Sequence, residues 1–411
     1  MMLLTTLLHR MVRSGSLTLI DADGRQHRFG DGGAPHVTVR LHDRKLHLKI
    51  ALNPSLAAGE AYMDGTLTIE DGSLRDFIDI ATRNFNSVYE SPMHRVARIA
   101  GFGARLLQQY NPADRSRKNV AHHYDLSGAL YDLFLDRDRQ YSCAYFAQPD
   151  DSLESAQLAK KLHIAAKLLL DKPNLTVLDI GCGWGGMALY LAKAAKADVT
   201  GITLSTEQAK LAESRAANAG LAETVRFKLQ DYRAETAQYD RIVSVGMFEH
   251  VGLPQFTTFF GKVRQLLKPD GVALIHSIGR MDGPGITDPW IRKYIFPGGY
   301  VPALSEVLPV IERAGLWVTD IEILRLHYAE TLKAWHANFI ANRAEAARIY
   351  DERFCRMWEF YLIGSEMAFR NMGQMVFQIQ LTREQTAVPL TRDYIFDWES
   401  AQRDQISAAA E

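Results

Sequence analysis

One glycine-rich turn limits the possible folds of this chain more than any other feature. The segment VLDIGCGWGG, residues 177–186, is an apolar run that carries Asp179 near its end and then forms a literal G-x-G-x-x-G. Such a turn joins a buried strand to a helix, and its glycines let the backbone approach a bound cofactor closely. The segment therefore predicts a cofactor site at a strand–helix junction.

From this turn onward, strand-like and helix-like patterns alternate along the chain. The predicted strands are residues 198–205, 225–231, 239–247, 271–279, 316–324 and 375–383, and the predicted helices are 186–195, 206–220, 254–267 and long stretches within 328–371. This alternation is typical of an α/β fold with a doubly wound, mainly parallel sheet. Ligands of such sheets bind at the carboxyl ends of the strands, so those ends are the candidate site.

Residues 1–90 have a different pattern and predict a small α+β domain. SLTLIDADGRQHRFG contains a hairpin signal at Asp23-Gly24, HVTVRL and LHLKIAL read as further strands, and residues 56–85 have helical spacing with Ser73 as a cap. Before them, Leu4, Leu7 and Met11 repeat at helical spacing. That first helix either docks on its own domain or a second subunit, or lies in a membrane interface.

A basic stretch separates this domain from the α/β region. Residues 91–118 carry six Arg or Lys against the single acid Asp114, interleaved with apolar residues. This pattern fits a solvated amphipathic linker, or a surface that contacts anionic lipid headgroups. The expected catalytic domain then spans residues 119–395, and residues 396–411 form a C-terminal tail.

Composition excludes several classes of function. Basic and acidic residues nearly balance, 47 against 48, so no global field favours nucleic acid. Three cysteines without C-x-x-C spacing argue against a disulfide framework or a zinc cage and fit a cytoplasmic protein. No apolar run reaches the twenty or so residues of a membrane-spanning helix, and no metal site is expected.

The residues around the glycine turn favour S-adenosylmethionine over a dinucleotide. Asp179 would repel a pyrophosphate but suits a ligand with a sulfonium and an ammonium group. The next strand ends in ITLS, without the acid that would hold a dinucleotide ribose. Thr203, Leu204 and Gln208 can instead reach a ribose, and Asp231 can accept a hydrogen bond from an adenine amino group.

A second group of polar residues follows the later strands. Glu249 and His250 come after the fourth strand, His276 and Ser277 come after the fifth, and Tyr328 begins a helix after the sixth. Each alone could be a satisfied polar group of the core. Their common place at one edge of the sheet favours a catalytic role.

Eight motifs together resemble the cyclopropane-fatty-acyl-phospholipid synthases. They are HYDLSGALYDLFLD, YSCAYF, VLDIGCGWGG, GITLS, QDYR, FEHVG, YIFPGG and HYAETLKAW, and GEAYMDG in the N-terminal region is a further marker. The resemblance implies a Rossmann-like class I methyltransferase fold with helical insertions over an acyl pocket. It also implies transfer of a methylene from S-adenosylmethionine to the cis double bond of an acyl chain in membrane phospholipid.

The same resemblance assigns residues to two ligands. Bicarbonate, the expected general base, is held by Cys143, largely through its backbone, and by Glu249, His276, Ile278 and Tyr328. The cofactor contacts are Tyr141, Ser142, Gly181, Gly183, Thr203, Leu204, Gln208, Tyr232 and Arg233, to which the strand-end reading adds Asp179 and Asp231.

An attacked alkene becomes cation-like, so the site should be dry and lined by aromatic rings. Phe146, Phe248, Tyr294, Phe296, Tyr300 and Trp335 are the candidates for that lining. Nothing within YSCAYF activates the thiol of Cys143, so we do not expect it to be a nucleophile.

One departure from the family and several alternatives remain open. Ser365 stands where many members carry a cysteine once proposed as catalytic. The departure leaves open a methyl- or methylene-branched product. Because related sequences also methylate small amines, a small-amine N-methyltransferase is a further alternative, and an inactive lipid-binding protein is the last, against which the set of Glu249, His276 and Tyr328 argues. The resemblance further implies a homodimer that is peripheral at the inner membrane surface.

Overall fold

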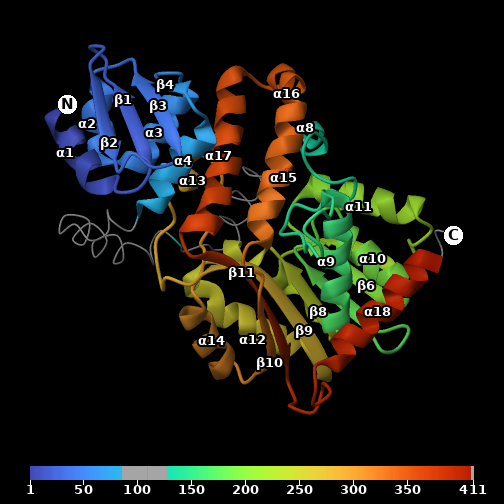
Figure 1. The fold of residues 1–411 in the computed structure, drawn as a ribbon. Coiled ribbons are helices and arrows are strands. Elements are labelled where there is room, and N and C mark those ends of the chain that lie inside the picture. The colour runs from blue at the N-terminus through green and yellow to red at the C-terminus, as the bar shows by residue number, and fades with distance from the viewer. Residues whose placement is uncertain (86–108, 110–126, 409–411) are drawn as a thin grey trace.

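The computed structural model describes residues 1–85, residue 109 and residues 127–408, arranged around two sheets (Figure 1). Apart from Gln109, the basic stretch predicted at 91–118 lies outside these residues. Within the described part of the chain, no helix has the length and apolar character needed to span a membrane.

The larger sheet has seven strands in the order β10-β11-β9-β8-β5-β6-β7. Only β11 runs antiparallel to its neighbours, so the predicted doubly wound, mainly parallel sheet is confirmed. Its strands are β5 (Thr176–Ile180), β6 (Asp198–Thr203), β7 (Val225–Leu229), β8 (Tyr239–Val245), β9 (Leu267–Arg280), β10 (Trp317–Ile323) and β11 (Gln374–Thr382).

Helices cover both faces of this sheet, which explains why its central strands are apolar almost throughout. One face packs on α9 (Leu153–Lys167), α10 (Gly186–Ala195) and α11 (Thr206–Asn218). The other face packs on α12 (Phe256–Leu266) and α14 (Leu304–Arg313), where Phe256, Phe259 and Phe260 are fully buried. Short 3-10 turns, η1 (Tyr232–Ala234), η2 (Phe248–His250) and η3 (Leu253–Gln255), follow β7 and β8.

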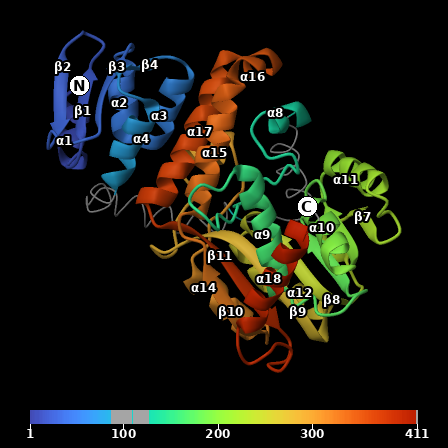
Figure 2. The same ribbon diagram turned by 45° about the vertical axis from the view of Figure 1, so that its right-hand side comes forward.

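A helical arm rises from the carboxyl end of the sheet, as predicted for residues 328–371. It consists of α15 (His327–Ala341), α16 (Arg343–Ile349) and α17 (Glu352–Asn371), which stand between the two sheets in Figure 2. Together with α8 (Gly128–Asp132) and α13 (Pro289–Tyr294), the arm encloses an apolar cluster that includes Phe134, Trp335 and Trp358.

The N-terminal residues form a second sheet of four strands in the order β2-β1-β3-β4. Its elements are β1 (Ser16–Ile20), β2 (Gln26–Gly30), β3 (His36–Leu41), α2 (Lys45–Leu52), α3 (Pro54–Met63), β4 (Leu67–Asp71) and α4 (Leu74–Arg83). The hairpin around Asp23-Gly24 is confirmed. The predicted Ser73 cap is present as a capping box with Asp76.

Two predictions within this sheet were wrong. LHLKIAL is the helix α2 and not a strand, because burial selects Leu46, His47 and Ala51 while Leu48 and Leu52 stay exposed. A strand would have buried every second residue instead. The stretch predicted to be helical, residues 56–85, also contains the edge strand β4. In this strand only the first residue, Leu67, is fully buried.

The first helix, α1 (Met2–Met11), packs on its own sheet, one of the alternatives left open above. Leu4 is 1% exposed and, with Leu7, Leu8 and Met11, contacts the apolar interior of the N-terminal sheet. Its apolar face is therefore already covered within the chain.

The GEAYMDG segment joins the N-terminal sheet to the catalytic part. A Cβ on Gly59 would lie 2.5 Å from the ring of Trp290 in α13, so glycine makes room for the indole. Glu60 accepts hydrogen bonds from Lys293 at 2.5 Å and Tyr294 at 2.9 Å. Asp64 pairs with Arg353 of α17 at 2.7 Å. This marker of the resemblance is therefore a contact between the two sheets' domains.

The C-terminal boundary needs a correction. Residues 396–408 are not a separate tail, because they continue the helix α18 (Asp393–Ala408), which packs on α9 (Figure 1). Glu399 of this helix reaches His163 of α9. The predicted limit at residue 395 therefore cuts through an element of the α/β domain.

Candidate active site

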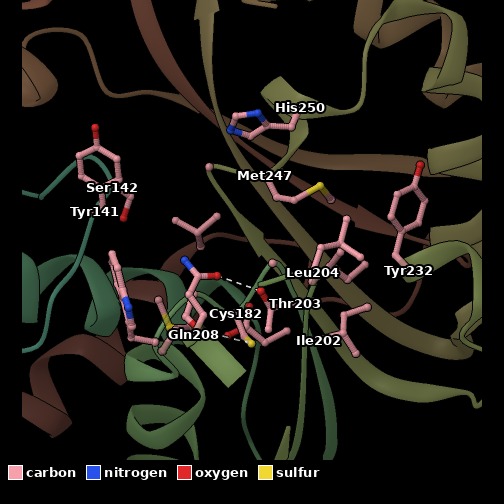
Figure 3. Close-up of a pocket in the computed structure, with 18 of the residues that line it drawn as sticks. Tyr141, Ser142, Cys182, Ile202, Thr203, Leu204, Gln208, Tyr232, Met247 and His250 are labelled. Atoms are coloured by element: carbon pink, nitrogen blue, oxygen red, sulfur yellow. Dashed lines mark hydrogen bonds between the residues drawn. The ribbon is translucent and has the colours of Figure 1, made fainter. Parts of the chain in front are cut away.

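A cavity opens at the carboxyl ends of β5, β6, β7 and β8, where ligands of this sheet type bind. Figure 3 shows Tyr141 and Ser142 at one end of it and Tyr232 at the other. All eleven residues predicted to contact the cofactor line it: Tyr141, Ser142, Asp179, Gly181, Gly183, Thr203, Leu204, Gln208, Asp231, Tyr232 and Arg233.

The glycine turn needs its glycines for two different reasons. Gly181 and Gly183 have φ of +83° and +53°, a left-handed backbone that side chains disfavour. A Cβ on Gly181 would also lie 2.7 Å from the side chain of Met247, whereas one on Gly183 would meet nothing within 4 Å. The space beside Gly183 therefore stays open to a ligand.

Asp179 has the surroundings of a carboxylate that lacks a partner. It is 2% exposed, and its Oδ2 has no hydrogen-bond partner among the described residues. Burial raises the pKa of Asp179 to about 7, although the charge of Lys160 acts in the opposite direction. A cationic ligand would supply the missing partner, which fits the ammonium and sulfonium of S-adenosylmethionine.

The far side of the cavity presents polar groups from β6, α11 and the end of β7. Thr203 Oγ1 donates to Gln208 Oε1 at 2.8 Å, as the dashed line in Figure 3 shows. Asp231 differs from the expectation of a carboxylate facing only adenine, because Arg233 already donates to it at 2.6 and 2.8 Å. An adenine amino group would share this carboxylate with the guanidinium.

Helix α9 fixes the loop that carries Tyr141 and Ser142. The amide of Gln157 donates to the carbonyl oxygens of Gln140 and Ser142 at 3.1 and 3.0 Å. The ammonium of Lys160 donates to Ser142 Oγ and to Gln140 Oε1, both at 2.7 Å. Lys160 is fully buried, and burial lowers its pKa to about 8. The sequence did not reveal this clamp, because Lys160 and the neighbouring Lys161 have the pattern of a solvated helix face.

The five residues predicted to hold bicarbonate are not among those that line the cavity. Ile278 N–H donates to Glu249 Oε1 at 2.6 Å, while Glu249 Oε2 is buried without a partner in the described part of the chain. Burial raises the pKa of Glu249 to about 7, against the hydrogen bond from Ile278. A buried acceptor of this kind fits a ligand that carries a hydroxyl hydrogen.

His276 lies within β9, which continues to Arg280, and not after the strand as predicted. Ile278 lies in the same strand. His276 pairs across to Val245, so it is still level with the carboxyl end of β8. Ile278 packs against the cluster that contains Cys143 and Tyr328. The fold therefore joins Glu249 of η2 to Ile278 of β9 and packs Ile278 against the cluster of Cys143 and Tyr328, while His276 lies two residues earlier in the same strand.

Cys143 is buried at 1% exposure, and burial raises the pKa of its thiol. Its Sγ donates to the carbonyl oxygen of Ala144 at 3.3 Å. A nucleophilic cysteine needs the opposite, a lowered pKa and access. These surroundings fit the expectation that the backbone, and not the sulfur, serves the site.

The six aromatic candidates separate into three groups. Trp335 and Phe296 belong to the arm cluster, where Trp335 lies 5.1 Å from the ring of Tyr141 and Phe296 lies 6.0 Å from His250. Phe248 and Tyr300 instead belong to the core cluster packed by α12 and α14 and are not among the residues that line the cavity. Tyr294 also packs against the arm cluster, with its hydroxyl donating to Glu60 of α3 at 2.9 Å, and Phe146 stacks on His327.

Three further residues line the cavity; of these, the sequence places His250 after the fourth strand, whereas Trp184 and Met247 were not assigned from it. Trp184, Met247 and His250 line the cavity, and burial lowers the pKa of His250 to about 4. Their positions directly beside predicted residues, within the glycine turn and after β8, were the available signal. Ser365 lies on α17 and is partly exposed.

The profile of the Mycolic acid cyclopropane synthetase family matches residues 111–379. The chain belongs to this family. A profile described as a domain of unknown function matches residues 4–92, the N-terminal sheet region. The family and the cavity together identify the catalytic part as an S-adenosylmethionine-dependent methyltransferase.

Individual relatives extend over most of the chain. A cyclopropane-fatty-acyl-phospholipid synthase of Escherichia coli K12 is 39% identical over 355 residues, covering 86% of this chain and 89% of the relative. The tuberculostearic acid methyltransferase UfaA1 of Mycobacterium tuberculosis is 35% identical over 398 residues, and the match covers 92% of this chain and 90% of UfaA1.

Among solved structures, mycolic acid cyclopropane synthase CmaA1 complexed with SAH and CTAB is 34% identical with a TM-score of 0.62. The match covers 66% of this chain and 98% of CmaA1. SAH is the demethylated product of S-adenosylmethionine, in keeping with the cofactor predicted for this cavity.

Proposed function

We propose that this protein is a cyclopropane-fatty-acyl-phospholipid synthase that transfers a methylene from S-adenosylmethionine to the cis double bond of an acyl chain in membrane phospholipid. The observation that supports this most directly is one combination. The cavity contains the buried carboxyl of Asp179, whose Oδ2 has no hydrogen-bond partner among the described residues. Glu249, two residues after the cavity residue Met247, likewise keeps one unpartnered oxygen, Oε2, while its Oε1 accepts from Ile278 N–H.

Each group has a separate task in this proposal. S-adenosylmethionine, when bound, supplies an electrophilic methyl group to a weakly nucleophilic alkene. Asp179 and the glycine turn orient that cofactor, and the loop clamped by α9 closes over it. The aromatic arm cluster around Trp335 keeps water from the cation-like carbon.

Ring closure also requires that a proton leave the transferred carbon. Cys143 lacks the properties of a base with access to that proton, because its thiol is buried and burial raises its pKa. A bicarbonate ion held by Glu249, His276, Tyr328 and the backbone at Cys143 and Ile278 supplies the base when bound. Glu249 Oε2 would accept its hydroxyl proton, which keeps its remaining oxygens directed toward the substrate.

A second product is favoured by one specific observation. The similarity to the tuberculostearic acid methyltransferase UfaA1 extends over 92% of this chain, so a branched acyl chain is the alternative outcome. The same cavity would serve both reactions: the transferred methyl loses a proton in each, but a methylene branch forms when a hydride shifts to the cationic carbon before that proton leaves, whereas the ring forms when the carbon–carbon bond closes instead.

The decisive test is incubation with vesicles of a cis-unsaturated phospholipid and trideuteromethyl-labelled S-adenosylmethionine. A ring that retains two deuterium atoms supports the proposal, and NMR separates it from a methylene branch. A branched chain would favour the second candidate, and turnover of soluble amines without vesicles would overturn both.

We further infer a peripheral location at the inner membrane surface and a homodimer. Both rest on the family resemblance and on the basic stretch at 91–118. Flotation with anionic vesicles tests the location, and a protein that does not float with them would contradict it. Light scattering tests the oligomeric state, and a monomer would contradict the homodimer.

A further inference from the structure

A row of polar side chains, buried apart from the partly exposed Glu322, crosses three strands beside the proposed bicarbonate site. The strand register places Glu322 of β10 opposite Gln378 of β11, and Gln378 opposite His276 of β9. Lys167, at the end of α9, lies over this row and is fully buried. Gln378 and His276 are 1% and 2% exposed, so water does not compete for their hydrogen bonds.

The hydrogen bonds of this row have a definite direction. Lys167 Nζ lies 2.8 Å from Gln378 Oε1, and Gln378 Nε2 lies 3.1 Å from His276 Nδ1. An ammonium can only donate, so the amide must turn its oxygen toward Lys167. Its NH2 group then faces His276, and Nδ1 of the ring must accept.

We propose that Lys167 and Gln378 are positioning residues that hold His276 as the neutral tautomer protonated on Nε2. The ring thereby offers an N–H donor on the side away from Gln378. The use of that donor, to bind the anion beside Glu249, rests on the proposed function. The tautomer itself is a property of the free protein.

The charges around His276 agree with a neutral ring. Burial lowers the pKa of His276 well below its ordinary value, and the positive charges of Lys160, Lys167 and His163 act in the same direction. The negative charge of Glu322 opposes them. With the ring neutral, the accepting Nδ1 leaves Nε2 as the nitrogen that carries the proton.

A second histidine, His163, supports Lys167 indirectly, because both bond to Glu322. His163 is positively charged, in contrast to the neutral His276. Lys167 pairs with Glu322, whose carboxylate also receives His163 Nε2 at 2.6 Å. Nδ1 of His163 bonds to Glu399 of α18, so both its nitrogens face carboxylates. Burial alone would lower the pKa of His163, but these two hydrogen bonds raise it. An imidazolium on α9 thus anchors the carboxylate that anchors Lys167.

The most direct test is nitrogen-15 NMR of the ligand-free protein labelled at histidine. His276 is one of 13 histidines, so its signals are assigned by their loss in His276→Gln. We expect an unprotonated Nδ1 and a protonated Nε2 in the wild type. A protonated Nδ1 would overturn the proposal whatever the activity of the enzyme.

A nearly isosteric substitution of Gln378 should exchange the protonated and unprotonated nitrogens of His276. In Gln378→Glu a carboxylate faces both Lys167 and His276, so Nδ1 should become protonated. We expect the bicarbonate concentration for half-maximal turnover to rise at least tenfold, with unchanged affinity for S-adenosylmethionine. Lys167→Met frees the amide to rotate and should give mixed tautomers, a second readout if Gln378→Glu does not fold.

The matched control is Gln380→Glu, on the same strand but outside the row. Gln380 bonds to the carbonyl oxygen of Lys167 and to Tyr394, not to His276, so this variant should leave the tautomer unchanged. If the wild type has the expected tautomer but turnover does not depend on bicarbonate, the inference stands and the proposed base is wrong. If Gln380→Glu switches the tautomer as Gln378→Glu does, the specific role of Gln378 is refuted.

Discussion

The cofactor cavity and the polar row behind it meet at the same sheet edge but are built in opposite ways. In the cavity, glycines and backbone form the wall, and Asp179 is left with an unpartnered oxygen. In the row, Lys167, Gln378 and His276 are connected by hydrogen bonds that fix one arrangement. The cavity therefore has room for a ligand whose charge is opposite to that of Asp179, whereas the polar row is already organised by its own hydrogen bonds.

This difference indicates how the two regions would contribute to one reaction. An unpaired buried carboxylate gains most from a cationic ligand, so the cavity should set affinity. The hydrogen-bonded row is already organised and needs little rearrangement during the reaction, so it should affect the rate. Glu249 should also affect the rate, because it is proposed to hold the base. Variants in the two regions should therefore separate affinity from turnover.

The largest expected effect comes from Glu249→Gln. The amide cannot accept the ligand hydroxyl in the same way and loses the charge, so turnover should fall by roughly 10² to 10⁴-fold, the range of acid–base groups. Affinity for S-adenosylmethionine, measured by calorimetry, should change little. A variant with wild-type turnover would remove Glu249 from the proposed site.

Asp179→Asn should act on affinity instead. Loss of a charge-assisted hydrogen bond costs about 1.5–3 kcal/mol, or roughly a 10- to 150-fold weaker dissociation constant. In the wild type the free carboxyl has a pKa of about 7, so protonation competes with the cationic ligand as pH falls. Affinity should thus decrease below pH 7 in the wild type and stay flat in Asp179→Asn. Parallel pH profiles would contradict this role.

The two glycines of the turn offer a matched pair with a smaller effect. Gly181→Ala combines a strained φ with a Cβ 2.7 Å from Met247, whereas Gly183→Ala carries only the strain. Left-handed strain costs about 1–2 kcal/mol, so both variants should lose stability. Gly181→Ala should have the lower melting temperature and about tenfold weaker cofactor binding. Equal losses in the two variants would show that the contact with Met247 is unimportant.

Cys143→Ser should have the smallest effect, a loss of turnover of less than about tenfold, since one buried sulfur is replaced by a smaller polar atom. The backbone that is expected to face the ion stays in place. Complete loss in a folded variant, or a covalent acyl or methyl adduct on the wild-type sulfur seen by mass spectrometry, would instead indicate a catalytic thiol.

The cofactor cavity could be predicted from the sequence because its signals are local. Asp179, Gly181 and Gly183 lie within one turn, and Asp231 follows the end of a predictable strand. The family resemblance added Tyr141 and Ser142, whose loop is far from the turn in sequence. All of them line one cavity in the structure.

The polar row could not be predicted in the same way. Gln378 and His276 are about a hundred residues apart, and only the register between β9 and β11 places them side by side. Lys167 reads as a solvated lysine until α9 is packed on the sheet. LHLKIAL shows the same limit, because tertiary burial of His47 and Ala51 decided its helix against its strand-like composition.

The most direct test of the account is the dependence of turnover on bicarbonate in the wild-type enzyme. Methylene transfer to unsaturated phospholipid vesicles would be measured in buffer freed of carbon dioxide and then with added bicarbonate. We predict that turnover falls sharply on depletion and is restored in a saturable manner. Full turnover in the depleted buffer would contradict the central claim that a bound ion, and not a protein side chain, accepts the proton.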